Sequence, residues 1–296
     1  MSSEVHPQTK SEIRALLRGA DVRPNRRRGQ SFLIDGNLMR CVFEAADVTA
    51  SDLVFEVGTG TGSLTRMLAA AAGEVVTVEV DATLADIARG ELSACSNVTL
   101  IRADVLAGKH RLNPEVLDAL EAAAARHEQT KLVANLPYSA ATPLLLNLVF
   151  ASIVFERMVF TVQAEVSERL VATPGTRAYG WVSVVVALAG EAEVLRPLPA
   201  TAFWPQPEVA SALVRFRPRA DWRSGIDVER LCAFGTFVFQ QRRKTTLRIL
   251  RDTVKRADCE IDPAALLDKL GIDAKTRGDQ LTPSEILGLS QTLPTQ

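Results

Sequence analysis

The sequence predicts an α/β protein with a doubly wound sheet, helices on both faces, and a small all-helical domain after it. Between residues 50 and 220, short β-branched runs alternate with helical patterns, which is typical of βαβ units. Most of these runs are continuously apolar, as expected for strands covered on both faces. Beyond residue 221 the pattern is helical, with no candidate strand. The 296 residues, 47% of them hydrophobic, favour two domains over one.

Seven strands are expected, at 53–57, 75–80, 97–104, 131–136, 157–163, 193–198 and 212–218. Asn113-Pro114 is typical of an N-cap and first turn, and opens a helix that runs to about His127. Residues 227–257 fit one or two amphipathic helices, and Asp262-Pro263 and Thr282-Pro283 begin two more. We therefore divide the chain into a basic N-terminal segment (1–30), a sheet domain (31–220) and a helical domain (221–296).

The net charge of −1 conceals an uneven distribution. Residues 1–30 carry +4 and residues 215–256 carry +8, whereas residues 31–130 carry −8. A focused basic patch attracts phosphate even on a neutral protein, although a solvated helix face is the simpler alternative for either segment alone. The two basic segments are therefore candidate nucleic-acid contacts.

The cysteines and histidines do not form a ligand pattern. Four widely spaced cysteines without a CxxC pair indicate reduced thiols, and three histidines without an HExxH pattern make a metal site improbable. The N-terminal residues lack the layout of a signal peptide, and the longest apolar stretch (143–155) is too short to span a bilayer. We expect a cytoplasmic monomer with neither a metal nor a membrane partner.

Three successive strand ends carry groups suited to a nucleoside. The first strand is followed by Gly58, Gly60 and Gly62, where glycines let a ligand approach the backbone at a helix N-terminus. This spacing is not the GxGxxG fingerprint. Glu79 ends the next strand and could accept ribose hydroxyls, and Asp104 ends the third and suits an adenine amino group. Taken alone, the glycines could form an ordinary tight turn, and each carboxylate could be a surface or capping residue. Together, a glycine-rich turn followed by two acidic strand ends resembles the S-adenosylmethionine-dependent class I methyltransferases with a Rossmann-like fold.

The fourth strand ends in Asn135-Leu136-Pro137-Tyr138. A stiff turn is the structural alternative, because Pro137 forces Leu136 to be extended. The chemical interpretation starts from the exocyclic amine of a nucleobase, a poor nucleophile whose lone pair is delocalised into the ring. The Asn135 side-chain oxygen and the Leu136 carbonyl could hold both amine hydrogens and aim the lone pair at a methyl donor, while Tyr138 stacks on the base. Such a base must be flipped out of its helix or loop.

Six sequence blocks, in order, resemble the small-subunit ribosomal RNA adenine N6,N6-dimethyltransferases. They are RRRGQSFLID (26–35), FEVGTGTGSLT (55–65), VEVD (78–81), ANLPYSAATPLL (134–145), AFWPQPEVASALVRF (202–216) and QQRRKTTLR (240–248). The resemblance covers about residues 20–280. It implies transfer of two methyl groups to each of two adjacent adenines in the 3′-terminal hairpin of small-subunit (16S) rRNA, on an assembling 30S subunit.

The resemblance also implies roles for individual residues, in three groups. The cofactor S-adenosylmethionine would be bound by Ser31, Leu33, Gly58, Gly60, Glu79, Asp104 and Asn135. The catalytic group, with the base between its two aromatic rings, would be Asn135, Leu136, Pro137, Tyr138 and Phe203. The RNA phosphates would be contacted by Arg26, Arg27, Arg28, Arg242, Arg243 and Lys244, the last three in the helical domain.

The sequence departs from the family in three places. Ser31 replaces the usual asparagine, Thr59 stands where a proline often follows the first glycine, and an extended helix is expected between Asp104 and Asn135. The first change could remove a side-chain contact to the cofactor.

Two other functions remain open. One is a large-subunit rRNA adenine methylase of the antibiotic-resistance type, which shares the Asn-Leu-Pro-Tyr segment. The blocks AFWPQPEV and QQRRKT near the C-terminus favour the small-subunit enzymes instead. The other is a non-catalytic ribosome assembly factor, which would have no need of an intact cofactor crevice. DNA and protein methyltransferases tend to carry Asn/Asp-Pro-Pro-Tyr/Trp instead.

Overall fold

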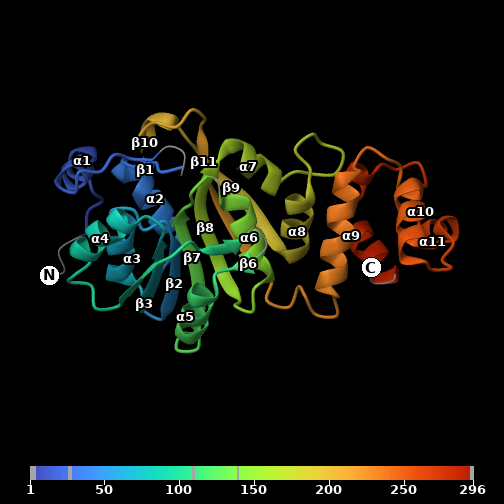
Figure 1. The fold of residues 1–296 in the computed structure, drawn as a ribbon, viewed down its shortest axis with the longest axis horizontal. Helices are drawn as coiled ribbons and strands as arrows, with labels where there is room; N and C mark the ends of the chain where they lie inside the picture. Colours follow the sequence, from blue (N-terminus) through green and yellow to red (C-terminus); the bar gives the residue numbers. More distant parts are fainter. Residues whose placement is uncertain (1–4, 26–28, 109–110, 139, 294–296) are drawn as a thin grey trace. The chain divides into compact units, whose positions relative to one another are not determined.

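The computed structural model describes residues 5–25, 29–108, 111–138 and 140–293, which divide into two compact units (Figure 1). The first unit comprises the chain up to Ser167 together with Ala192–Pro218, and the second comprises Glu168–Glu191 and Arg219–Gln296. The break between Pro218 and Arg219 lies next to the expected boundary at 220. Residues 168–191 differ from expectation, since we had placed them in the sheet domain. They contain α8 (Trp181–Ala189), whose apolar face packs on helices of the second unit.

A seven-stranded sheet forms the centre of the first unit, in the order β4-β3-β2-β7-β8-β11-β9. All seven predicted strands are present: β2 (Asp52–Val57), β3 (Glu74–Glu79), β4 (Val98–Arg102), β7 (Gln129–Asn135), β8 (Phe155–Gln163), β9 (Gly190–Leu198) and β11 (Ser211–Pro218). Strands β4, β3, β2, β7 and β8 run parallel, and β11 is antiparallel to β8. The carboxyl ends of the parallel strands therefore meet at one edge, where the predicted site residues lie.

Helices cover both faces of this sheet, as predicted. α2 (Gly36–Ala46), α3 (Ser63–Ala71) and α4 (Ala82–Glu91) lie on one side in Figure 1, and α5 (Pro114–Ala124) and α6 (Ala141–Phe150) on the other. α2 and α3 bury their apolar stripes against strand residues such as Val54 and Val159 in one core cluster. The Asn113 side chain caps α5 by accepting from the N–H of Glu115, and Pro114 occupies the first turn, as expected. The helix ends at Ala124 instead of near His127.

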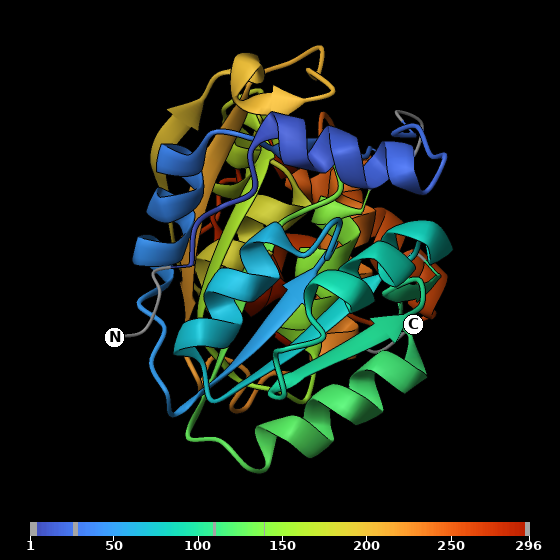
Figure 2. The ribbon, with the colours of Figure 1, turned by 90° about the vertical axis from the view of Figure 1, so that its left-hand side faces the viewer.

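Short elements that we did not predict carry the N-terminal segment to the carboxyl edge. α1 (Lys10–Gly19) buries Ile13 and Leu17 against Leu84 of α4 and crosses that end of the sheet (Figure 2). β1 (Phe32–Leu33) then pairs antiparallel with β10 (Phe203–Trp204). A second small ribbon joins β5 (Leu106–Gly108) to β6 (Arg111–Leu112). Strands of two or three residues have too little pattern to be read from sequence.

The second unit is helical, with α8, α9 (Val228–Gln240), α10 (Thr246–Ala257), α11 (Pro263–Leu270) and α12 (Pro283–Thr292). Residues 227–257 thus form two helices, and the expected starts at Asp262-Pro263 and Thr282-Pro283 are confirmed, with both side chains capping. α8 and α9 approach closely at Gly235, where an added Cβ would lie 2.1 Å from the Trp181 ring. α7 (Ala164–Leu170) and two 3-10 turns, Ala200–Ala202 and Gly278–Gln280, complete the described chain. Across the described ranges no helix is long and apolar enough to cross a membrane.

Candidate active site

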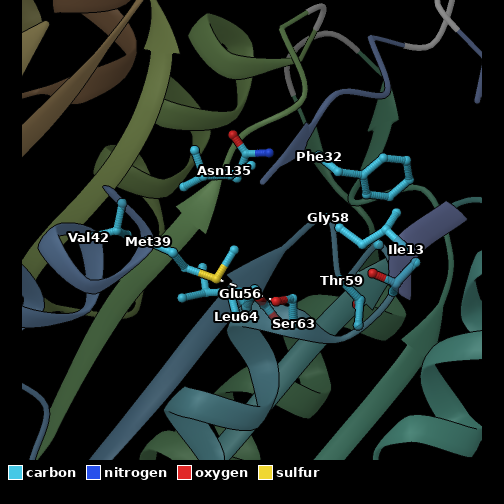
Figure 3. A pocket seen from close by; sticks show the side chains of 13 residues that line it. Ile13, Phe32, Met39, Val42, Glu56, Gly58, Thr59, Ser63, Leu64 and Asn135 are labelled. Atoms are coloured by element: carbon cyan, nitrogen blue, oxygen red, sulfur yellow. Dashed lines mark hydrogen bonds between the residues drawn. The ribbon is translucent and has the colours of Figure 1, made fainter. Parts of the chain in front are cut away.

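A cavity of about 400 Å³ opens at the carboxyl edge of the parallel strands. Six of the seven predicted cofactor residues line it: Ser31, Gly58, Gly60, Glu79, Asp104 and Asn135. The seventh, Leu33, lines a smaller neighbouring cavity of about 50 Å³ that shares Gly58, Gly60 and Asn135 with the first. Figure 3 shows this smaller cavity, with Asn135 and Phe32 at one end and Met39, Leu64 and Ser63 at the other. The side chains predicted at the ends of separate strands thus line one cavity.

The turn after β2 brings the backbone close to Asn135 and Pro137. Gly58, Gly60 and Gly62 all have positive φ angles, of 88°, 58° and 82°. A Cβ at Gly58 would lie 3.5 Å from the Asn135 carbonyl oxygen and 3.6 Å from the Pro137 ring. These contacts are of ordinary length, so it is the positive φ that favours glycine at this position.

Glu79 is almost fully buried and is held by the backbone of the turn. Its Oε2 accepts from the N–H of Gly60 at 2.9 Å, and its Oε1 accepts from the N–H of Asp81 at 2.9 Å. Burial raises the pKa of this carboxyl, while the two N–H donors act in the opposite direction. Each oxygen has a further lone pair, so Glu79 can also accept hydroxyl donors of a ligand.

Asp104 is an exposed residue that lines the same cavity. Its Oδ1 accepts from the N–H of Leu106 at 2.9 Å, and its main-chain carbonyl accepts from Asn113. The carboxylate is therefore held by a local turn next to the unpredicted β5–β6 ribbon. An acceptor at this place suits an amino group of a ligand.

The amide of Asn135 has a defined orientation. Its Nδ2 donates to the main-chain carbonyl of Ser31 at 2.8 Å, and its Oδ1 accepts from the hydroxyl of Thr161. A carbonyl oxygen can only accept, so the amide nitrogen must face Ser31 and the oxygen must face away from it. Because a carbonyl oxygen has two lone pairs, Oδ1 can accept a second hydrogen bond.

The remainder of the Asn-Leu-Pro-Tyr segment is equally well fixed. The Leu136 N–H donates to the carbonyl of Thr161 at 3.3 Å, and Pro137 lines the larger cavity. The Tyr138 hydroxyl shares a hydrogen bond of 2.8 Å with Ser211, and burial raises its pKa. The phenol is therefore neutral at physiological pH, and its ring is tethered to β11.

The Ser31 hydroxyl donates to the Pro205 carbonyl at 2.9 Å and ties the N-terminal segment to the segment after β10, while Ser31 itself lines the larger cavity. The predicted role of Phe203 needs correction. Phe203 is 2% exposed and packs in the core cluster with Leu33 and Leu213, so it offers no free face to a base. The partly buried Trp204 beside it stacks on Phe32 at 6.4 Å.

Two site residues were missed by the sequence analysis. Thr161 holds the Asn135 amide, and its only sequence signal is a hydroxyl within an apolar strand. Gln8 is buried beneath the glycine turn, where it exchanges hydrogen bonds with Thr61 and its N–H donates to Ser63. Gln8 had no signal, because it belongs to no motif and lies in a segment that we considered only for its charge.

Only half of the predicted RNA contacts lie among the described residues. Arg26, Arg27 and Arg28 lie outside the described residues. Arg242 and Arg243 are exposed between α9 and α10, and Lys244 is partly buried with its ammonium 3.2 Å from Asp252. The exposed face of α10 adds Arg248, Arg251, Lys255 and Arg256. The second unit therefore presents a basic surface. No group of His, Cys, Asp and Glu side chains suited to a metal occurs among the described residues.

The sheet order and the cavity at its carboxyl edge define a class I methyltransferase with a Rossmann-like fold. A dimethyladenosine transferase from Plasmodium falciparum shares this fold with a TM-score of 0.70 at 20% identity, over 86% of this chain and 94% of that one. The chain belongs to the ribosomal RNA adenine dimethylase family, whose model matches residues 22–293. It is 36% identical to Ribosomal RNA small subunit methyltransferase A of Moorella thermoacetica, over 94% of this chain and 96% of that protein. The structure of the 23S rRNA methyltransferase ErmE is similar with a TM-score of 0.62 at 26% identity, over 88% and 99% of the two chains.

Proposed function

We propose that this protein transfers methyl groups from S-adenosylmethionine to the N6 amines of two adjacent adenines in the 3′-terminal hairpin of small-subunit rRNA. Family membership and the 36% identical small-subunit methyltransferase support the substrate. The observation that carries the chemistry is the orientation of the Asn135 amide. Its oxygen has a lone pair free for an amine hydrogen beside a cavity of the right size for a nucleoside cofactor.

The residues of the larger cavity fit S-adenosylmethionine. Glu79 has acceptors for the ribose hydroxyls, Asp104 has one for the adenine amino group, and Gly58 leaves the backbone open where the methionine end would lie. The cofactor supplies an electrophilic methyl group on a sulfonium centre. These residues would bind and orient it.

The chain's contribution to the chemical step is to position the target amine. Asn135 Oδ1 and the Leu136 carbonyl accept the two N6 hydrogens and favour a pyramidal nitrogen. With the amine held in this way, its lone pair would be directed at the methyl group that the bound cofactor would supply, and the N6 proton would pass to solvent. Tyr138, tethered by Ser211, offers its ring to one face of the base.

The second unit is proposed to bind RNA. Its exposed cations on and before α10 would contact phosphates, and this contact would depend strongly on salt. We propose that the protein acts as a cytoplasmic monomer on the assembling 30S subunit. The large-subunit alternative is less well supported, because ErmE is only 26% identical.

The test is a methyl-transfer assay with radiolabelled cofactor on unmethylated small subunits, large subunits and DNA, with mapping of the modified base. We expect label on adjacent adenines of small-subunit rRNA alone; labelling of large subunits alone would overturn the substrate.

Asn135→Ala tests the mechanism in the same assay. We expect transfer to fall by about 10²–10³-fold, the usual cost of losing one preorganised group at a reacting centre, with subunit binding retained. Asn97→Ala is the matched control, since Asn97 also donates to backbone carbonyls but lies away from the cavity. A fully active Asn135→Ala variant would refute the proposed mechanism.

A further inference from the structure

Thr161 is a polar exception within a buried strand. β8 contains Val159, Phe160 and Val162, all at most 1% exposed, and Thr161 among them is 0% exposed. Burying a hydroxyl costs free energy unless it forms a hydrogen bond, and valine would fill the same volume without that cost. The hydroxyl therefore calls for an explanation beyond packing.

The sheet register supplies the explanation. Thr161 lies opposite Asn135 in the parallel pair of β7 and β8, just as Val159 lies opposite Val133. Residues paired in register on neighbouring strands project from the same face of the sheet, and the hydrogen bond between the Asn135 and Thr161 side chains agrees with this. The Thr161 hydroxyl donates to Asn135 Oδ1.

The backbone of Thr161 contacts the residue that carries the second proposed acceptor. Its carbonyl accepts from the N–H of Leu136 at 3.3 Å, which fixes the peptide that follows Asn135. One residue of β8 thus contacts both residues proposed to hold the target amine, Asn135 at the end of β7 and Leu136 just after it. Ser31 completes the arrangement from the other side by accepting from Asn135 Nδ2.

We infer that Thr161 is a positioning residue for methyl transfer, which orients the Asn135 oxygen toward the amine of the target adenine. The inference rests on the proposed function. Without the hydroxyl, Oδ1 keeps its place only through the single bond between Nδ2 and Ser31, about which the amide can swing. Hydrogen bonds to charged or reacting groups depend on such fixed geometry, and a small misplacement lowers the rate of the chemical step.

The experiment compares Thr161→Val with Thr161→Ser in steady-state methylation of small subunits. We expect kcat to fall about three- to tenfold in the valine variant, the usual value of one hydrogen bond, with KM for the subunit unchanged. The serine variant keeps the hydroxyl and should return kcat to within about twofold of the parent protein. If the valine variant does not fold, Thr161→Ala removes the same hydroxyl.

Thr130→Val is the matched control, because Thr130 is buried at the opposite end of β7. It should leave kcat unchanged. A valine variant at Thr161 with normal kcat, or a serine variant as slow as the valine one, would overturn the positioning role. Asn135→Ala separates the two proposals. If this variant is inactive while Thr161→Val has normal activity, only the positioning role of Thr161 fails. If Asn135→Ala is active, the proposed mechanism itself is refuted.

Discussion

Replacement of Glu56 by glutamine should change how stability depends on pH. Glu56 lies on β2 beneath the glycine turn, is 1% exposed, and lines the smaller cavity. Its Oε2 accepts from the hydroxyls of Thr65 and Thr77, both at 2.6 Å. Burial raises the pKa of this carboxyl to about 7, and the two hydroxyls only partly oppose that effect.

The magnitude follows from the two pKa values. Folding raises the pKa from 4.5 to about 7, so the folded protein holds the proton more tightly than the unfolded chain. The resulting stabilisation is fully present below pH 4.5, declines as the pH rises, and is lost above about pH 7, a total change of about 3 kcal/mol. Glutamine does not ionise, so Glu56→Gln should lack this decline.

The assay is urea denaturation of both proteins at several pH values between 5 and 8. As the pH rises from 5 to 8, the parent protein should lose about 2 to 3 kcal/mol of unfolding free energy relative to Glu56→Gln. Above pH 7 the difference between the two proteins should stay constant. Any cost of packing the amide adds the same amount at every pH and does not affect the trend. A difference independent of pH would refute the assignment of a raised pKa to Glu56.

Two further predictions concern binding. Alanine at Arg242, Arg243 and Lys244 together should weaken binding to rRNA and reduce the slope of log affinity against log salt by about 2 to 3, whereas Lys269→Ala should leave it unchanged; an equal slope in the triple variant excludes these phosphate contacts. Gln8→Ala should weaken S-adenosylhomocysteine binding by about three- to tenfold in calorimetry, because it removes the side-chain bonds to Thr61 of the glycine turn. An unchanged Kd would show that the turn keeps its shape without Gln8.

The strands and helix starts could be predicted because their signals are local. Continuous apolar runs mark the seven buried strands, and caps such as Asn113 and Thr282 act on the backbone a few residues away. The β1–β10 pair could not be predicted, because its two-residue strands are 170 residues apart and associate only through the folded chain. The same holds for α8, whose apolar sequence does not say which unit it will join.

The candidate site was predictable where position in the sheet decides the outcome. Gly58, Glu79 and Asp104 meet because parallel strands end at one edge, whatever surrounds them. The direction of a side chain depends on neighbours distant in sequence, so the bond from the Ser31 hydroxyl to Pro205 could not be predicted. Phe203 failed for the same reason, since β1 buries it.

The helical unit is assembled from two separate stretches of chain, 168–191 and 219–296. During synthesis the first stretch leaves the ribosome long before α9 and α12, on which α8 packs. The apolar side chains of α8 therefore stay without their packing partners while about a third of the protein is still to be synthesised. A gene truncated after the sheet, near residue 220, would leave α8 permanently exposed, so the two units cannot be separated by a single cut in the chain.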